Sequence, residues 1–450
     1  MGEGQAAPPA DQATTVITGS PATSEIDAAT ATATATAARS GTGPGATSAT
    51  GVLSPTPSVP SVPPAPRPPT ERRRLPHLVP LDGLRGIAIG LVVGVHSGNA
   101  LWPEARYWLA AGGPLGVDLF FVLSGFLITA LLLGEAERRG GIDLAAFAGR
   151  RVRRLVPAVV GLVAVLAGLA VVGDRLALKG VLAAGTYALT FTTNLDQVHG
   201  DLPLVESLFG PAAERNVSEV NHLWSVGIEA QFYLLWGLVL WAASRARWSY
   251  GRIALLTLGL IAASAAWRAY RAAEGEQLLV LYLSPESRMD APLVGSLVGV
   301  AWSAGWLDKV RPADALRVGS VALAGFLAAA WLVRVESPPL YTHGLYTALA
   351  LLAAVALVGA IRAGPSSILA RALSWSPLVF LGTVSYSVYV WHYGIFAMVE
   401  RDGAHWPAPA RVLVAWAVSL AVATASHRYL ERPFLQRRPR PVADASGVSA

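Results

Sequence analysis

Eleven long apolar runs make up most of this chain and limit the folds that it can adopt. Each run approaches the roughly 20 residues that a helix needs to cross a bilayer. They fall at about 84–101, 113–133, 155–173, 178–195, 222–243, 253–270, 289–306, 314–333, 343–361, 377–398 and 409–427. Only 14% of the residues are charged, whereas a soluble domain carries about a quarter. The sequence therefore predicts an all-α fold, a polytopic membrane helical bundle.

The two ends of the chain differ from this pattern. Residues 1–75 consist mostly of Ala, Thr, Ser, Pro and Gly and include a repetitive stretch at Ala29–Ala37. Such a segment buries too little apolar surface to offset its ordering entropy, so we expect a disordered cytoplasmic tail. Residues 435–450 are expected to form a second disordered tail, which is basic. The transmembrane domain is accordingly predicted over residues 76–434.

Arginines beside the apolar runs predict the orientation, because cytoplasmic loops are enriched in basic residues. Arginine clusters precede the first run, separate the second from the third, and follow the last. The loop 196–221 carries five acids and one arginine, so we expect it outside. Cytoplasmic and external loops alternate along the chain only if the segment Lys179–Asn194 does not cross the membrane and is instead re-entrant or interfacial. The prediction is then about ten transmembrane helices in the plasma (inner) membrane with both termini cytoplasmic; eleven spans would place five C-terminal arginines outside.

Four ionisable residues lie inside the runs, about five to seven residues below the predicted outer ends: His96, Asp118, Glu229 and His392. At 1.5 Å per residue they would share a depth of roughly 7–11 Å. Ionisable residues in a membrane helix are costly and are functional candidates by default. We therefore expect an acid–base centre in which His96, oriented by Glu229 or Asp118, is the general base. The plainer alternatives are an intramembrane partner for Asp118 and a packing role for His392.

Arginines mark the predicted cytoplasmic side of this centre. Arg85 precedes His96 by eleven residues, which is roughly 16 Å along a helix and within about 20° of the same face. The cluster Arg150, Arg151, Arg153 and Arg154 follows the second run. Several guanidinium groups together suit a phosphate-rich ligand, although such a cluster is also typical of a plain membrane anchor. The pattern favours transfer of a group between the two membrane sides.

Other catalytic patterns are missing from the sequence. The chain has no Cys, which excludes disulfides, thiolate metal sites and a cysteine nucleophile. It also has no Walker-type glycine loop, no HExxH and no metal-ligand spacing. We therefore expect no metal and no permanently bound cofactor. The positive charge lies beside the apolar runs, so we expect contact with membrane lipid and no nucleic-acid partner.

Seven motifs carry a family resemblance. They are LDGLRG at Leu81–Gly86, GVDLFFVLSGFLIT at Gly116–Thr129, RRVRRLVP at Arg150–Pro157, LWSVGIEAQFYLLW at Leu223–Trp236, RMDAPLVG at Arg288–Gly295, LGTVSYSVYVWH at Leu381–His392 and YLERPF at Tyr429–Phe434. Because the seven motifs occur in this order, the chain resembles the acyltransferase type 3 family of integral membrane O-acyltransferases. It departs from the family pattern at Ala230, where a second acid is common, and at Gly227, where serine is frequent.

The resemblance implies an enzyme that moves an acyl group, often acetyl, from the co-substrate acyl-CoA to a hydroxyl of a sugar or related acceptor. It implies that His96 is the base, and it assigns Glu229 to the same site. It further implies that Arg85, Arg151 and Arg154 hold the donor, with Arg150 and Arg153 alongside. The remaining polar motif residues are expected to support the site: Asp118, Ser124, Trp224, Arg288, Asp290, Tyr386 and His392. Many relatives carry an extra SGNH-type domain that this chain lacks, so we expect it to act alone or with a separate partner.

Three functions stay open at this point. The first is O-acylation of a cell-envelope glycan or glycolipid. The second is the same chemistry on a small secreted metabolite such as a glycosylated macrolide. The third is a proton-coupled transporter that uses His96 and Glu229 as a proton relay. Transporters usually show repeats with broken helices at matching positions, and the motif-bearing runs show no such halves.

Overall fold

The computed structural model describes residues 76–105, 112–173, 176–200, 203–209, 219–334 and 337–436. Within these ranges every regular element is a helix, which confirms the predicted all-α fold. The predicted N-terminal tail and residues 437–450 of the predicted C-terminal tail lie outside the described residues.

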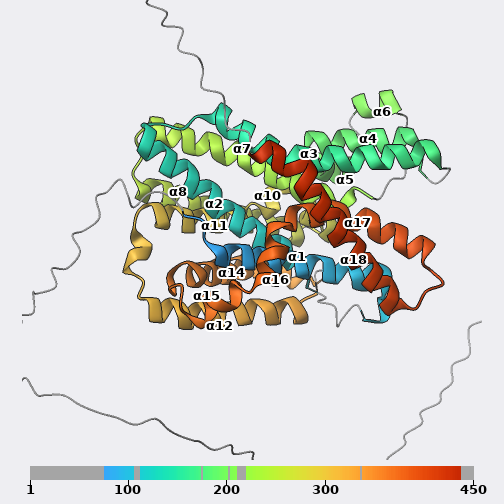
Figure 1. Cartoon of the computed structure of the whole chain (residues 1–450). Helices are drawn as coiled ribbons and strands as arrows, with labels where there is room; N and C mark the ends of the chain where they lie inside the picture. Colours follow the sequence, from blue (N-terminus) through green and yellow to red (C-terminus); the bar gives the residue numbers. More distant parts are fainter. Residues whose placement is uncertain are drawn as a thin grey trace, which may run out of the picture. The chain divides into compact units, whose positions relative to one another are not determined.

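Long helices are interspersed with short ones along the chain (Figure 1). The longer helices are α1 (Val79–His96), α2 (Leu115–Arg139), α3 (Leu144–Val172), α4 (Leu178–Thr190), α7 (Trp224–Arg245), α8 (Tyr250–Ala273), α11 (Asp290–Ser303), α12 (Pro312–Leu332), α14 (Leu345–Arg362), α17 (Ser385–Asp402) and α18 (Ala408–Ser426). The shorter ones are α5 (Thr193–His199), α6 (Pro203–Phe209), α9 (Leu278–Leu283), α10 (Pro285–Arg288), α13 (Pro339–Thr342), α15 (Ile368–Leu373), α16 (Ser376–Thr383) and α19 (Arg432–Leu435). Two π-helical turns, Ser97–Leu101 and His427–Glu431, extend α1 and α18.

Eight helices of the described part are long and apolar enough to cross a membrane. They are Val79–Leu101, Leu115–Arg139, Leu144–Val172, Asn221–Arg245, Tyr250–Ala273, Pro312–Leu332, Leu345–Arg362 and Ala408–Leu435. The two further predicted spans, 289–306 and 377–398, correspond to α11 and to α16 with α17. The chain is thus a multi-pass membrane protein with roughly ten spans. Helix α4 has only 13 residues, fewer than a crossing needs.

Glycines bring the central helices into backbone contact. A Cβ atom added to Gly125 of α2 would lie 1.8 Å from the carbonyl oxygen of Pro292 in α11. A Cβ added to Gly295 of α11 would lie 1.9 Å from the carbonyl oxygen of Val122 in α2. Small residues permit such close approach, which drives helix association in membranes. Figure 1 shows these two helices side by side.

Helix α1 is held in the same way against the helices near the C-terminal end. A Cβ added to Gly83 would lie 1.8 Å from the carbonyl oxygen of Leu373. One added to Gly382 in α16 would lie 1.8 Å from the carbonyl oxygen of Asp82. These contacts fix the helix that carries both Arg85 and His96.

Candidate active site

A cavity lined by residues of α1, α2, α3, α7 and α17 collects most of the polar residues predicted for the donor. Its polar lining consists of Arg85, Ser124, Arg151, Arg154, Ser225, Glu229, Tyr233, Ser385, Tyr386 and Tyr389. We call it the arginine cavity; its free volume is about 70 Å³. Arg151 and Arg154 are three residues apart in α3 and therefore share a face of that helix. Three guanidinium groups in one space can bind an anion that carries several phosphate oxygens.

The arginine cluster of α3 divides between two faces. Arg150 pairs with Glu135 of α2, its Nη2 atom 3.0 Å from the carboxylate, and it does not line the arginine cavity. Arg153 is also absent from the lining. Of the α3 arginines predicted for the donor site, Arg151 and Arg154 therefore line the arginine cavity, whereas Arg150 and Arg153 do not. The physical reason is helical phase, because consecutive residues point about 100° apart.

Glu229 lies in the arginine cavity. Its carboxylate accepts hydrogen bonds from the hydroxyl groups of Ser124 and Tyr233. The Tyr233 hydroxyl also lies 3.2 Å from the Ser124 hydroxyl, and its ring lies 5.7 Å from the guanidinium of Arg151. Glu229 therefore supplies the one carboxylate among the lining residues of a cavity that has three cations.

A second cavity contains His96. Its lining includes His96, Gln197, Asn221, His222, Trp224, Tyr282, Tyr389 and Tyr393, and its volume is about 370 Å³. We call it the histidine cavity. His96 is the last residue of α1 before the π-helical turn, a distortion that occurs frequently at functional sites. The Nδ1 atom of His96 lies 2.8 Å from Nε2 of His392 in α17.

The four ionisable residues that we expected at one depth do not form one centre. The hydrogen-bond partner of His96 is His392, so the expectation that Glu229 or Asp118 orients His96 is wrong. Glu229 bonds within the arginine cavity, and Asp118 pairs with Arg288. The cause is again the direction in which side chains leave the helix. Ser124 and its neighbours on one face of α2 line the arginine cavity, whereas Asp118 does not.

The two cavities adjoin. Val117 of α2 and Tyr389 of α17 line both of them, so these side chains form the partition. The Tyr389 hydroxyl donates to the carbonyl oxygen of His222 at 2.5 Å and accepts from the Ser225 hydroxyl at 2.6 Å. One turn earlier in α17, the Tyr386 hydroxyl donates to the Leu155 carbonyl oxygen at 2.6 Å. Both tyrosines therefore hold α17 against the elements that line the cavities.

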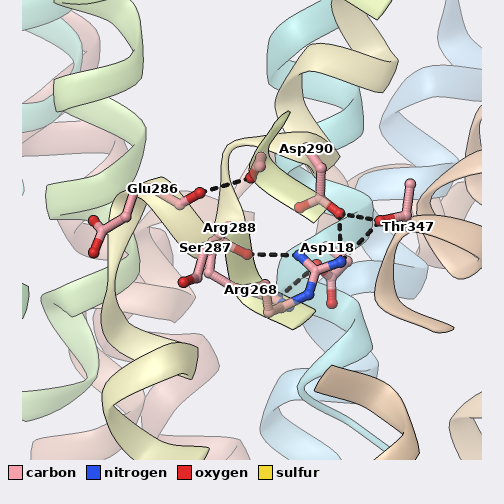
Figure 2. A network of polar contacts seen from close by, with 8 residues as sticks. Asp118, Arg268, Glu286, Ser287, Arg288, Asp290 and Thr347 are labelled. Atoms are coloured by element: carbon pink, nitrogen blue, oxygen red, sulfur yellow. Dashed lines mark hydrogen bonds and ion pairs between the residues drawn. The ribbon is translucent and has the colours of Figure 1, made fainter. Parts of the chain in front are cut away.

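Behind the histidine cavity lies a buried network of ion pairs (Figure 2). Arg288 donates to Asp118 at 2.6 Å, and Arg268 donates to Asp290 at 2.9 Å. All four side chains are at most 2% exposed. Thr347 also donates to Asp290, at 2.5 Å, and Figure 2 shows these groups converging from separate helices. The network joins α2, α8, α10, α11 and α14.

The same network supports the cavity wall. The Arg288 guanidinium lies 5.1 Å from the ring centroid of Tyr282 and 3.9 Å from that of Tyr346. Tyr282 in turn lies 4.6 Å from Trp224, centroid to centroid, and both line the histidine cavity. Trp224 thus lines the histidine cavity, and Arg288 packs against Tyr282 of the same lining.

Several site residues were missed in the sequence. Tyr233 could have been found, because it lies four residues after Glu229 and so shares its helix face. Arg268 is ambiguous in sequence because it resembles a flanking loop charge, yet it is fully buried. Tyr389 lies in the motif Leu381–His392, where its spacing from Tyr386 predicts a packing role only. His222 carries no signal of its own, since its contacts depend on which helices meet.

Comparison with known proteins identifies the family of the chain. A family model described as an acyltransferase domain matches residues 79–428. Peptidoglycan O-acetyltransferase OatA of Listeria monocytogenes is 29% identical over 373 residues, which cover 81% of this chain and 57% of that protein. Putative peptidoglycan O-acetyltransferase YrhL of Bacillus subtilis is 30% identical over 364 residues, 78% of this chain and 54% of that protein. O-acetyltransferase OatA of Staphylococcus aureus is 28% identical over 379 residues, 82% and 59% respectively.

The chain spans little more than half the length of these relatives. No solved structure matches it. The family match, in contrast, extends over most of the chain and contains both cavities. The resemblance found in the motifs is therefore confirmed, and the chain belongs to the acyltransferase type 3 family.

Proposed function

We propose that this protein is a membrane O-acetyltransferase that moves an acetyl group from acetyl-CoA to a hydroxyl of a cell-wall glycan. Membership of the acyltransferase family and the printed names of the relatives support the reaction class and the peptidoglycan acceptor. The observation that carries the proposal is the pair of adjoining cavities, one with three arginines and one with His96.

The arginine cavity is the proposed donor site. The diphosphate of coenzyme A would meet Arg85, Arg151 and Arg154, since guanidinium groups bind phosphate with paired hydrogen bonds. Its pantetheine arm would then extend along α1 toward the partition at Val117 and Tyr389. Arg85 and His96 are separated by eleven residues of α1, or roughly 16 Å, a distance that an extended arm can bridge. We further propose that this cavity faces the cytoplasm, where acyl-CoA is available, with both termini on that side.

The histidine cavity is the proposed place of transfer. The imidazole of His96 removes the proton from the acceptor hydroxyl as its oxygen attacks the thioester carbonyl carbon. The carbon–sulfur bond breaks, and the coenzyme A thiolate takes the proton back from His96. The products are an acetyl ester and free coenzyme A, so no acyl-enzyme is required. Aromatic side chains at Trp224 and Tyr282 provide a flat apolar surface for a sugar ring.

Glu229 has a different role in this proposal from the one that its depth suggested. Its carboxylate fixes the hydroxyls of Ser124 and Tyr233 and balances part of the positive charge around it. It thereby organises the donor site and does not touch His96.

The test is acetyl transfer by purified protein in proteoliposomes, with labelled acetyl-CoA and three acceptors: peptidoglycan strands, a glycolipid and a glycosylated macrolide. We expect coenzyme A release and an alkali-labile acetyl ester on the glycan. Since general base catalysis contributes about 10²–10⁴-fold, His96→Gln should lower the rate at least 100-fold. The matched control is His343→Gln, because His343 is exposed and lies outside both cavities. Absence of acceptor-dependent release from folded wild-type protein would refute the proposal; a response only to the macrolide would refute the glycan acceptor.

A further inference from the structure

His392 forms two hydrogen bonds that together restrict where its protons lie. Its Nδ1 atom is 2.8 Å from the carbonyl oxygen of Tyr389 and 3.1 Å from that of Val388, both in the preceding turn of α17. Its Nε2 atom is 2.8 Å from Nδ1 of His96. The His392 side chain is fully buried, so no water competes for these contacts.

The tautomers follow from the donor and acceptor inventory. A carbonyl oxygen can only accept, so Nδ1 of His392 must carry a hydrogen. A neutral imidazole has a single N–H group, which leaves Nε2 of His392 as an acceptor. The 2.8 Å contact then requires that Nδ1 of His96 donates. In neutral His96 the other ring nitrogen, Nε2, therefore holds a lone pair.

A general base needs a ring nitrogen with a free lone pair, and Nε2 of His96 is such a nitrogen. His96 lines the histidine cavity, and among the described residues only its Nδ1 atom has a hydrogen-bond partner. In the opposite tautomer, Nε2 would carry a hydrogen and could not accept a proton from a hydroxyl in the cavity. The hydrogen bond to His392 excludes that tautomer as long as His392 keeps its bond to the backbone.

We propose that His392 is a positioning residue that sets the tautomer of His96, so that Nε2 of His96 accepts the proton of the acceptor hydroxyl. The proposal deepens the proposed function and rests on it for the role of the base. The backbone of α17 is the fixed end of the chain of hydrogen bonds, from the Tyr389 carbonyl through His392 to His96. When His96 gains its proton, Nδ1 continues to donate to His392 and the geometry is unchanged.

The first test observes the tautomer directly. Nitrogen-15 NMR of the wild-type protein labelled at histidine, with His96→Gln to assign the signals, should show His96 protonated at Nδ1 and unprotonated at Nε2 in its neutral form. His392→Leu should remove this preference, whereas His343→Gln should keep it. A wild-type His96 protonated at Nε2 would overturn the proposal. Because the measurement does not need turnover, a protein with this tautomer and no acetyl transfer would refute the proposed function alone.

The second test separates positioning from packing. In His392→Gln the side-chain amide oxygen can still accept from His96 Nδ1, whereas His392→Leu fills the space without an acceptor. We expect kcat to fall at least about 100-fold in the leucine variant, since a wrong tautomer lowers kcat by about 10⁴-fold in a serine protease triad. KM for acetyl-CoA should stay within about twofold of the wild-type value. The kcat of His392→Gln should be at least about tenfold higher than that of His392→Leu. Equal losses in both variants, with both folded, would contradict the proposal.

Discussion

At the scale of single residues, both carboxylates of the buried ion-pair network are met by an arginine. Asp118 faces Arg288, and Asp290 faces Arg268. An unpaired charge in a membrane interior is costly, so each of these carboxylates must find a partner on another helix. The pairs therefore select one arrangement of the helices around the histidine cavity.

We predict that breaking the Asp118–Arg288 pair costs more than removing it entirely. Arg288→Met leaves a buried carboxylate alone and should lower the free energy of unfolding by about 3–5 kcal/mol. The double variant Asp118→Leu with Arg288→Met leaves no charge and should recover most of that loss. Arg311→Met is the control, because Arg311 is 82% exposed and 4.0 Å from Asp314, and should change stability by less than about 1 kcal/mol. Denaturation in detergent checks the series, and equal losses in the single and double variants would contradict it.

Several of the side chains that line the two cavities could be predicted from sequence, but their hydrogen-bond partners could not. Arg85, Arg151 and Glu229 line the arginine cavity, and His96 lines the other. The sequence places residues along a helix axis with fair accuracy, since the rise per residue is constant. It does not fix the rotation of one helix against another. That rotation decides that His96 meets a histidine and not a carboxylate.

At the scale of helices, the glycines of the motifs determine how closely the elements pack. Gly83 of the LDGLRG motif and Gly125 of the second motif both meet a backbone carbonyl of a neighbouring helix. These two motifs therefore contain residues that serve helix packing as well as polar residues of the candidate site. The polar residues of the site depend on these glycines for their positions.

A glycine substitution tests this dependence. We predict that Gly125→Ala destabilises the protein by about 1–3 kcal/mol or more, since its Cβ would lie 1.8 Å from the Pro292 carbonyl oxygen and the backbone must move. Gly168→Ala in α3 is the control, because a Cβ there meets nothing within 4 Å. It should be neutral or gain up to about 1 kcal/mol of helix propensity. Unfolding midpoints in detergent measure both, and a similar shift in the two variants would contradict the close-packing account.

Helix boundaries show what hydropathy can and cannot predict. The run predicted from 155 begins inside α3, which starts at Leu144, because the arginines interrupt the hydropathy but not the helix. The run at 377–398 is two helices that meet at Val384. Apolar composition predicts which segments can be buried, but it does not predict where an apolar segment divides into two helices.

At the scale of the whole molecule, the proposed reaction requires a defined orientation in the membrane. The proposed donor, acetyl-CoA, is cytoplasmic, so the proposal requires that the arginine cavity opens to that side. The basic residues flanking the helices predict this orientation.

The absence of cysteine makes the orientation directly measurable, since any introduced thiol is unique. We predict that Ser207→Cys in α6 reacts with a membrane-impermeant maleimide in intact cells. Ala246→Cys, between α7 and α8, should react only after permeabilisation. Both positions are exposed. The reverse pattern would place the arginine cavity on the outer side and contradict the proposed donor path.

The most direct test of the central claim separates donor binding from chemistry. We would measure coenzyme A affinity and acetyl transfer for Arg151→Gln, Arg153→Gln and His96→Gln. Loss of a charge-assisted hydrogen bond costs about 1.5–3 kcal/mol, so Arg151→Gln should weaken affinity at least tenfold. Arg153→Gln, on the same helix but outside the arginine cavity, should leave affinity nearly unchanged. His96→Gln should keep wild-type affinity and lose transfer. If His96→Gln instead weakens coenzyme A binding as much as Arg151→Gln does, the division of donor binding and chemistry between two cavities is wrong.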